Sequence, residues 1–271
     1  MICYTKNEIY TILKNQLALE FNCKAEDFEK EENIITLPSL HPNRRKFSDK
    51  EFFLQMATLG RNTVISANEK MHPWLAQWVK DKKGFWLFEQ HNFFELESEL
   101  RKYGFKMTQT HHMFLPKPEQ VEITTDLKIK WLEQADIMNF YGAPRFPNAI
   151  CDKFKPERPD ILAIVALDEN ASDEKGGERI MGMAGCSIDA AANESLEAPA
   201  LWQIGIVVMP EYRGHKIGTT LVSLLRNEAF RRGALPYYGT SLSNLASWKI
   251  ALASGFEPAW VECEAHEIET E

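Results

Sequence analysis

The stretch IGIVVMPEYRGHKIGTTLVSLL, residues 204–225, predicts a strand, a turn and a helix in succession. Its first five, mostly apolar residues indicate a strand that ends before Pro210. A basic turn with two glycines follows, and apolar periodicity then predicts a helix from Thr219 to about Arg232, stopped by Gly233. A helix N-terminus after such a turn has unpaired N–H groups and a partial positive charge, so it can receive a phosphate group.

The composition of the turn fits a pyrophosphate. Gly214 and Gly218 allow the backbone to approach a ligand closely, and basic side chains surround them. The expected contacts are Arg213, Gly214, His215, Lys216, Ile217, Gly218 and Thr219. A dinucleotide-binding fingerprint needs G-x-G-x-x-G, and a P-loop needs G-x-x-x-x-G-K-[ST]. Neither spacing is present, so both of these loop types are excluded.

Two motifs resemble one known family. V-x-P-E-Y-R-G-x-x-I-G, residues 208–218, resembles the CoA-binding segment of the GNAT acetyltransferases, whose core is [Q/R]-x-x-G-x-[G/A]. SNLASWKIALASGF, residues 243–256, resembles the N-x-x-[A/S]…GF helix and strand start of the same family. The order of strands fits this family back to about Leu127.

The resemblance implies an acyl-CoA-dependent N-acyltransferase with acetyl-CoA as co-substrate. The pantetheine would lie along the strand at Ile206, Val207 and Val208. Asn244 would contact the pantetheine arm, and Ser247 the far side of the cofactor.

The chain departs from the family pattern at three positions. Lys216 replaces a glycine of the turn, Ala251 stands where many members have a tyrosine acid, and Gln203 stands where some have a glutamate base. A thiolate leaves without much help, because its conjugate thiol has a pKa near 8.5. Removing the proton from an alkylammonium group with a pKa near 10.4 at pH 7 costs about 4.6 kcal/mol. For an amine with a pKa near 7.7 the same step costs about 1 kcal/mol. The substitutions therefore favour a weakly basic acceptor or a base elsewhere.

Three residues are candidates for catalysis: Asp189, Tyr238 and Gln203. Asp189 follows a strand and could lie beside the cleft where two central strands diverge, although an aspartate that ends a strand is more often part of a turn. Tyr237 and Tyr238 are adjacent on a predicted strand, so their side chains face opposite ways. One of them could reach the cleft as an acid, and at least one is expected to pack in the core.

The chain divides at FLPKPEQVE, residues 114–122, where two prolines interrupt a strand-like run. We expect an N-terminal α/β domain at residues 1–118 and a GNAT acyltransferase domain at residues 119–271. The fold class is α/β, with a mixed, mostly antiparallel central sheet flanked by helices. In the second domain, strands are expected at 127–133, 161–168, 179–189, 204–208, 235–241 and 256–265, with an acidic turn at 169–178 and a helix at 244–254.

The first half ends on a similar plan. We expect strands at 62–67, 84–89 and 105–115, and helices at 69–82 and 92–103. Aligning Gly104 with Gly255 superimposes these elements at an offset of 151 residues, which favours a degenerate GNAT-like repeat. The alternative is two unrelated α/β segments that share a glycine helix stop. Only one residue separates strand from helix in the first half, so one CoA site per chain is expected.

Composition excludes several function classes. A net charge of −8 argues against nonspecific nucleic-acid or anionic-membrane binding, and no apolar run approaches the ~20 residues that span a bilayer. The N-terminus lacks the apolar core of a signal peptide. The five cysteines, Cys3, Cys23, Cys151, Cys186 and Cys263, show no paired spacing, so no disulfide framework and no metal site are expected.

These features predict a cytoplasmic protein that binds no nucleic acid and no membrane, and the family resemblance implies a small-molecule amine as its partner. Two functions remain open at this point. One is acetyl transfer to such an amine, and the other is a noncatalytic acyl-CoA-binding sensor or scaffold. The sequence does not indicate an oligomeric state.

Overall fold

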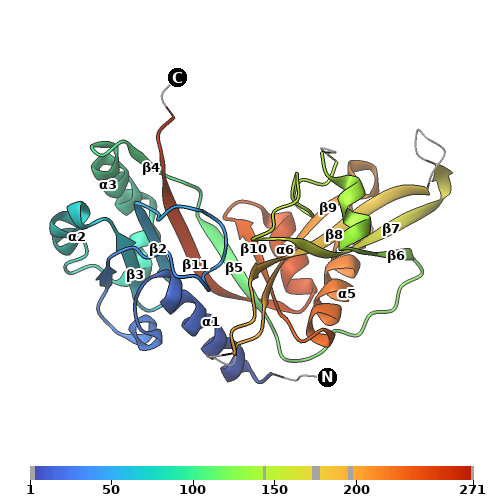
Figure 1. The fold of residues 1–271 in the computed structure, drawn as a ribbon, viewed down its shortest axis with the longest axis horizontal. Coiled ribbons are helices and arrows are strands. Elements are labelled where there is room, and N and C mark those ends of the chain that lie inside the picture. The colour runs from blue at the N-terminus through green and yellow to red at the C-terminus, as the bar shows by residue number, and fades with distance from the viewer. Residues whose placement is uncertain (1–3, 143–144, 173–177, 195–197, 270–271) are drawn as a thin grey trace. The chain divides into compact units, whose positions relative to one another are not determined.

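The computed structural model describes residues 4–142, 145–172, 178–194 and 198–269 (Figure 1). Its contacts divide the chain into two compact units, and neither is continuous in sequence. Unit 1 comprises Met1–Lys6, Phe114–Gly239 and Asn244–Glu257, and unit 2 comprises Asn7–Met113, Thr240–Ser243 and Pro258–Glu271. The expected boundary at residue 118 lies close to the change of unit at Phe114, but residues 258–271 belong with the first half of the chain.

Runs of consecutive strands and strand–helix–strand connections both occur along the chain, so the expected alternation holds only in part. The helices and strands up to residue 116 are α1 (Lys6–Glu20), η1 (Ala25–Glu29), β1 (Ile34–Thr36), β2 (Leu54–Thr58), β3 (Thr63–Ala67), η2 (Glu69–Met71), α2 (His72–Trp78), η3 (Gly84–Phe88), α3 (Gln90–Arg101), β4 (Phe105–Met107) and β5 (His111–Pro116). Those that follow are β6 (Lys128–Glu133), α4 (Gln134–Ile137), η4 (Met138–Phe140), β7 (Asp160–Ser172), β8 (Glu178–Ala190), β9 (Leu201–Val208), η6 (Pro210–Tyr212), α5 (Ile217–Arg231), β10 (Leu235–Ser241), α6 (Leu245–Ala253) and β11 (Phe256–Glu267).

Unit 1 is built on a mixed, mostly antiparallel sheet. Strands β6, β7, β8 and β9 pair antiparallel in sequence order, and β10 joins β9 in parallel. The strand–helix–strand connection from β9 through α5 to β10 explains this parallel pair, because parallel neighbours need a crossover. The mixed sheet and its flanking helices confirm the predicted fold class.

Alternation along β9 assigns its side chains to two cores. Trp202 and Ile204 are buried on the face that α5 covers, with Leu221 and Leu225 of that helix. Val207 packs into a second cluster on the opposite face, around α4 and residues 146–150. Both faces of the sheet are therefore covered, and β9 is an interior strand between β8 and β10.

The strands of unit 2 include β11, from the C-terminal end of the chain, which pairs with both β2 and β4. β1 pairs with β3 in parallel, β3 pairs with β2 antiparallel, and β11 pairs with β2 antiparallel, with Cys263 opposite Met56. The end of β11 also pairs with β4, where Ala265 lies opposite Met107. These ladders are the physical reason why the last strand belongs to unit 2.

The expected strand at residues 84–89 is wrong, because this segment forms the 3-10 helix η3. Its aromatic composition favours a strand locally, but its start is fixed by a tertiary contact. The Thr63 hydroxyl donates to the Gly84 carbonyl at 2.7 Å, and a Cβ on Gly84 would lie 2.3 Å from the backbone of Asn62. The segment that aligned with it, β10, is a strand, so the internal repeat does not extend through this element.

Other sequence predictions differ in detail. The expected strand at 105–115 is two strands, β4 and β5. The expected helix at 69–82 is the shorter pair η2 and α2, and strand β7 extends into the expected acidic turn, of which residues 173–177 lie outside the described residues. Gly104, Gly233 and Gly255 have positive φ angles of 82°, 80° and 79° after helices, as predicted for helix stops. No described helix is both long and apolar enough to cross a membrane.

Candidate active site

The turn before α5 has the left-handed backbone that its glycines predict. Gly214 has a φ of 86°, and Lys216, the N-cap residue of α5, has a φ of 60° and a ψ of 6°. Lys216 stands where the family pattern has a glycine, so the conformation is the one that glycine would adopt without strain. The Arg213 guanidinium donates to the Val208 carbonyl at 3.2 Å and ties the turn to the end of β9.

The helix begins at Ile217, two residues earlier than predicted, so Gly218 lies in its first turn. A Cβ on Gly218 would lie 2.9 Å from Cδ1 of Ile250 on α6. A side chain at this position would therefore have to displace the end of Ile250. The amide groups of this turn have no carbonyl partner within the helix, because the first turn of any helix leaves its N–H groups free. His215 and Lys216 are exposed beside them.

The pairing of β9 with β10 stops before either strand ends. Their parallel register runs from the Leu235–Leu201 pair to the Tyr238–Ile204 pair. Beyond it β9 continues to Val208 and β10 to Ser241, without pairing to each other. The edge of β9 that carries the predicted pantetheine contacts, Ile206, Val207 and Val208, faces this opening and leads directly to the turn before α5.

Two further predicted cofactor contacts lie at the start of α6. Asn244 is its N-cap residue, and its side-chain oxygen accepts from the Ser247 amide at 3.1 Å. The Ser247 hydroxyl is 2.6 Å from the hydroxyl of Tyr238. Burial raises the pKa of Tyr238, an effect that the hydrogen bond from Ser247 partly offsets, so this phenol remains protonated at neutral pH. Tyr238 is 2% exposed and packs in the core beneath α5.

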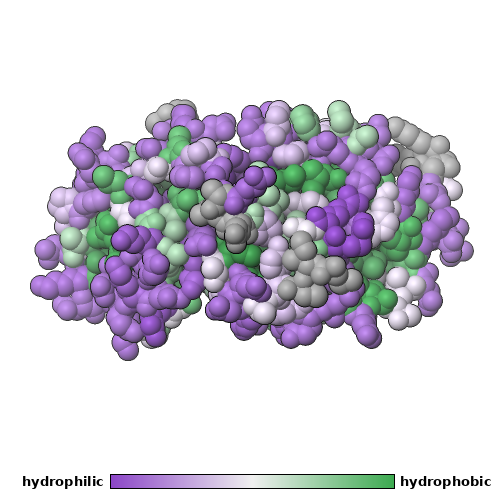
Figure 2. Space-filling view, turned by 60° about the horizontal axis from the view of Figure 1, so that its bottom comes forward, coloured by the Kyte–Doolittle hydropathy of each residue, from purple (hydrophilic) through white to green (hydrophobic). Residues whose placement is uncertain are grey.

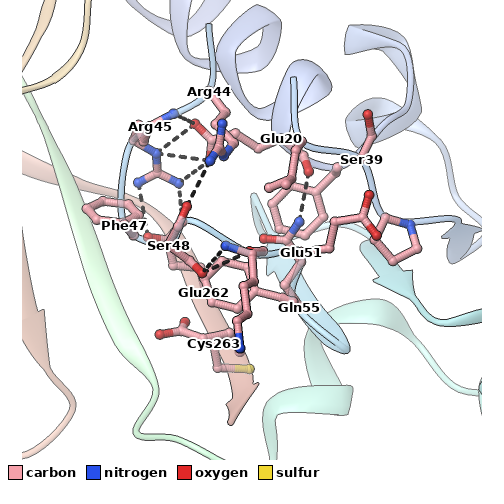
Figure 3. Close-up of a pocket in the computed structure, with 16 residues that line it drawn as sticks. Glu20, Ser39, Arg44, Arg45, Phe47, Ser48, Glu51, Gln55, Glu262 and Cys263 are labelled. Atoms are coloured by element: carbon pink, nitrogen blue, oxygen red, sulfur yellow. Dashed lines mark hydrogen bonds and ion pairs between the residues drawn. The ribbon is translucent and has the colours of Figure 1, made fainter. Parts of the chain in front are cut away.

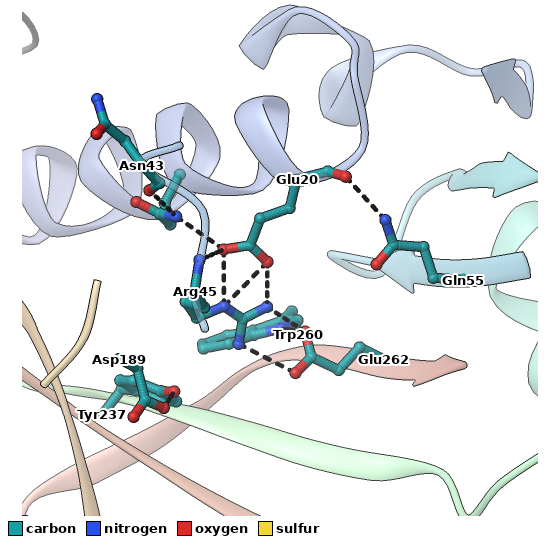
Figure 4. Close-up of polar contacts among 9 residues, drawn as sticks. Glu20, Asn43, Arg45, Gln55, Asp189, Tyr237, Trp260 and Glu262 are labelled. Carbon is teal, nitrogen blue, oxygen red and sulfur yellow. Dashed lines mark hydrogen bonds and ion pairs between the residues drawn. The ribbon is translucent and has the colours of Figure 1, made fainter. Parts of the chain in front are cut away.

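Asp189 is at the centre of a buried polar cluster on the other face of the strands. It is 0% exposed, and its carboxylate accepts from Arg158 at 2.5 Å and from the Ser187 hydroxyl at 2.8 Å. It also accepts from the Tyr237 hydroxyl, which lies against it in Figure 4. Arg158 also donates to the side-chain oxygen of Gln203. Burial opposes the charge of Arg158, but the Asp189 carboxylate outweighs it and raises the pKa of the guanidinium.

The three catalytic candidates therefore fall into two groups. Asp189 and Gln203 are joined through Arg158, whereas Tyr238 belongs with Ser247. Sequence reasoning did not select Arg158 or the hydroxyl of Tyr237. Arg158 lies in a proline-rich loop 31 residues before its partner, and no local pattern signals an ion pair over that distance.

No group of three or more described His, Cys, Asp or Glu side chains is placed to hold a metal ion. Cys23, Cys151, Cys186 and Cys263 are free thiols, and Cys3 lies outside the described residues. Burial raises the pKa of Cys151, with a further contribution from Asp160. Arg158 donates to its sulfur at 3.9 Å.

Comparisons with known proteins identify the domain. Residues 130–256 match the model of the Acetyltransferase (GNAT) family. A GCN5-related N-acetyltransferase-like protein from Streptococcus suis is 14% identical, over 66% of this chain and 69% of that chain, with a TM-score of 0.45. A GCN5-related N-acetyltransferase from Sphaerobacter thermophilus is 12% identical, over 77% of this chain and 73% of that chain, with a TM-score of 0.42.

A third solved structure is an aminoglycoside N-acetyltransferase in complex with CoA. It is 16% identical, over 53% of this chain and 97% of that chain, with a TM-score of 0.32. No curated protein sequence matches this chain. The family match covers the separating strands, the turn and both following helices, and it agrees with the motifs read from the sequence. Residues 130–256 therefore form a domain of the GNAT acetyltransferase family.

Proposed function

We propose that the protein transfers the acetyl group of acetyl-CoA to the amine of a small molecule. The observation that carries this proposal is the separation of β9 from β10 beyond Ile204, next to the first turn of α5. An unpaired strand edge can hydrogen-bond the amides of pantetheine as another strand would, and the helix N-terminus favours the pyrophosphate. One feature of the fold thus provides for both ends of the cofactor.

In this proposal the amides of residues 213–219 bind the pyrophosphate, with Arg213, His215 and Lys216 adding positive charge. The free amide of Asn244 faces the pantetheine arm, because its oxygen is occupied in capping α6. The strand amide of Val208 holds the oxyanion that forms when the thioester is attacked. Four described cysteines with free thiols support a reducing, cytoplasmic location.

The acceptor is a neutral amine that attacks the thioester directly. We assign Asp189 a positioning role, because it is fully buried and accepts hydrogen bonds from Arg158, Ser187 and Tyr237. Arg158 donates to the side-chain oxygen of Gln203, so the remaining group of this amide, its NH2, can only donate. Gln203 then orients an oxygen of the acyl group or of the acceptor. Tyr238 is the proposed donor to the leaving sulfur, in company with Ser247.

The test combines binding and turnover. Acetyl-CoA at about 100 times its Kd should raise the free energy of unfolding by about 2.7 kcal/mol, and calorimetry should give one CoA per chain. Release of free CoA thiol should then occur with members of an amine panel. Without a carboxylate base, the rate should rise about tenfold per pH unit below the pKa of the amine. A larger increase in melting temperature with NAD than with acetyl-CoA would contradict the proposal.

A noncatalytic acyl-CoA-binding module is the second candidate. The observation in its favour is the complete pairing of Asp189, together with a glutamine at the position of a possible base. This function predicts tight acetyl-CoA binding and no thiol release above the hydrolysis rate with any amine. The turnover assay therefore separates the two candidates directly.

A further inference from the structure

A second polar cavity lies in unit 2, built on residues that the CoA site does not use (Figure 3). It encloses about 50 Å³, and its wall includes Glu20, Arg45, Phe47, Glu51, Glu262 and Glu264. A buried water occupies roughly 10–15 Å³ by the same kind of measure, so the space admits a group of a few heavy atoms. This size fits the head group of a ligand rather than a whole cofactor.

Arg45 occupies the inner wall and is fully committed to two carboxylates (Figure 4). It is 5% exposed and donates to Glu20 at 2.7 to 3.0 Å and to Glu262 at 2.7 and 3.0 Å. Trp260 donates to Glu262 at 2.6 Å. Burial alone would raise the pKa of Glu262, but the charge and hydrogen bonds of Arg45 and the bond from Trp260 together lower it. The three-membered group thus has a net charge of −1 and no edge of the guanidinium toward an anionic ligand.

Glu264 adds a second carboxylate on the same side of β11. It lies two residues beyond Glu262, so the two side chains share one face of the strand. The one ion pair that the described residues form with Glu264 is to His266, at 3.7 Å. Burial, and then the charge of Glu262, raise the pKa of Glu264 to about 7, with Arg45 lowering it. Glu264 is therefore a cavity-lining carboxylate whose one ion-pair partner among the described residues is a histidine.

The side chains of the whole wall have one more negative charge than positive charges. It has four carboxylates, from Glu20, Glu51, Glu262 and Glu264, and three basic groups, from Arg44, Arg45 and Lys50. Arg44 donates to the carbonyl oxygens of His41 and Ser48, which fixes it in the loop. One ammonium group would bring the wall to neutrality, and it would give Glu264, whose side chain is 27% exposed, a partner that is cationic at neutral pH.

The rim of the cavity is apolar. Leu40 and Phe47 both line it, and they are 40% and 44% exposed. Phe52, also at the rim, stacks on the ring of His266. Large exposed apolar side chains around a polar cavity are typical of a ligand site, because they bury the body of a ligand whose head group is held inside.

We propose that this cavity binds the primary ammonium group of a small amine with an apolar body, with Glu264 as its counter-ion. The charge of the wall selects a cation, its volume selects a small head group, and its rim selects the apolar body. The proposal does not rest on the proposed function of the CoA site. The amine could be the acceptor of the transfer or a separate effector, and the chemistry of recognition is the same.

The binding test uses the full chain without CoA and three probes of similar shape. 2-Phenylethylamine should bind, and calorimetry should detect neither the neutral 2-phenylethanol nor the bulkier quaternary analogue with three N-methyl groups. Glu264→Gln should weaken 2-phenylethylamine binding at least tenfold, because a charged hydrogen bond is lost. Glu267→Gln, a change at an exposed residue of the same strand that does not line the cavity, should alter it less than about twofold. Equal binding of the amine and the alcohol, or unchanged binding in Glu264→Gln, would overturn the proposal.

A turnover assay then distinguishes the two sources of the amine. If the amine is the acceptor, Glu264→Gln raises its KM in acetyl transfer and leaves the acetyl-CoA melting shift unchanged. If the amine is an effector, Glu264→Gln abolishes its binding while transfer to other amines continues at the original rate. Both results support an amine site in this cavity. If the unaltered chain does not bind acetyl-CoA, the proposed function fails, and the amine site is not affected.

Discussion

Lys216 is the residue at which the sequence departs from the family pattern while the backbone keeps to it. Its φ of 60° costs a non-glycine residue about 1 kcal/mol. Lys216→Gly should therefore raise the free energy of unfolding by about that amount, measured by urea titration. Lys216→Ala retains the strain and serves as the matched control. If the ammonium group contributes to pyrophosphate binding, both variants weaken acetyl-CoA binding equally, whereas a purely backbone cradle leaves both unchanged.

Gly218 gives a second prediction at this scale, because its Cα packs against Ile250. Gly218→Val should lower the free energy of unfolding by about 1–3 kcal/mol through overpacking. Pairing it with Ile250→Ala makes room for the branched side chain and should restore part of this loss in thermal melts. Acetyl-CoA affinity of the double variant then reports on the first turn of α5 itself. Equal stability of Gly218→Val and the unaltered chain would show that α6 does not constrain this position.

Helix α5 also holds the segment that leads into β6, through a buried arginine. Arg226 is 0% exposed and donates to the carbonyl oxygens of Lys117 and, at 2.9 Å, Glu119. Its guanidinium lies over the rings of Phe230 and Phe256, and burial lowers its pKa to about 10.

Replacing Arg226 with Met leaves two carbonyl groups without their donor. We expect the free energy of unfolding to fall by about 2–5 kcal/mol, measured by urea titration. Arg231→Met, on the exposed side of the same helix, is the control and should change it by less than about 0.5 kcal/mol. Equal effects of the two substitutions would contradict a clamping role for Arg226.

Strand β11 should contribute a distinct pH dependence through Glu264. Its pKa of about 7 in the folded chain lies above the 4.5 of a free glutamate, so folding favours its protonated form. This contribution to the free energy of unfolding therefore increases as pH falls from about 7 to about 4.5, by at most about 3 kcal/mol. The charged groups that face Glu264 are Glu262, Arg45 and His266.

The comparison of Glu264→Gln with the unaltered chain isolates this contribution. The glutamine variant should be the more stable at about pH 8, and the difference should shrink to less than about 1 kcal/mol at pH 5, in urea titrations at both values. A difference that is independent of pH would show that Glu264 titrates normally. Other carboxyl groups, such as that of Glu262, have lowered pKa values, so their contribution to the free energy of unfolding decreases as pH falls. This decrease is the same in both proteins.

The sequence predicts elements well where the signal is local. Glycine stops at 104, 233 and 255 and the periodicity of α5 fix helix ends to within a few residues. It fails at η3, where the contact between Gly84 and the backbone of Asn62 overrides an aromatic, strand-like composition. Likewise, the cofactor turn is readable as a contiguous motif, whereas the Arg158–Asp189 pair and the Arg45 group join residues far apart in sequence and have no local pattern.

At the scale of the whole molecule, neither half of the chain holds all of its own unit. A fragment of residues 120–271 lacks Phe114 from its core and the carbonyl groups that Arg226 holds. A fragment of residues 1–118 lacks β11, the neighbour of β2 and β4. We expect both fragments to be unfolded alone, as measured by circular dichroism and amide dispersion in NMR spectra. A cooperative melt of either isolated fragment would contradict this expectation.

The place of β11 in unit 2 has a consequence for how the protein is made. Residues 1–113 leave the ribosome long before residues 258–271, which complete their sheet. At about 5–20 residues per second, the delay is roughly ten seconds or more. During this time one edge of β2 has no partner and is open to pairing with other nascent chains. Slow codons or a shortage of chaperones should therefore promote aggregation of the nascent chain during translation, rather than of the complete protein after its release.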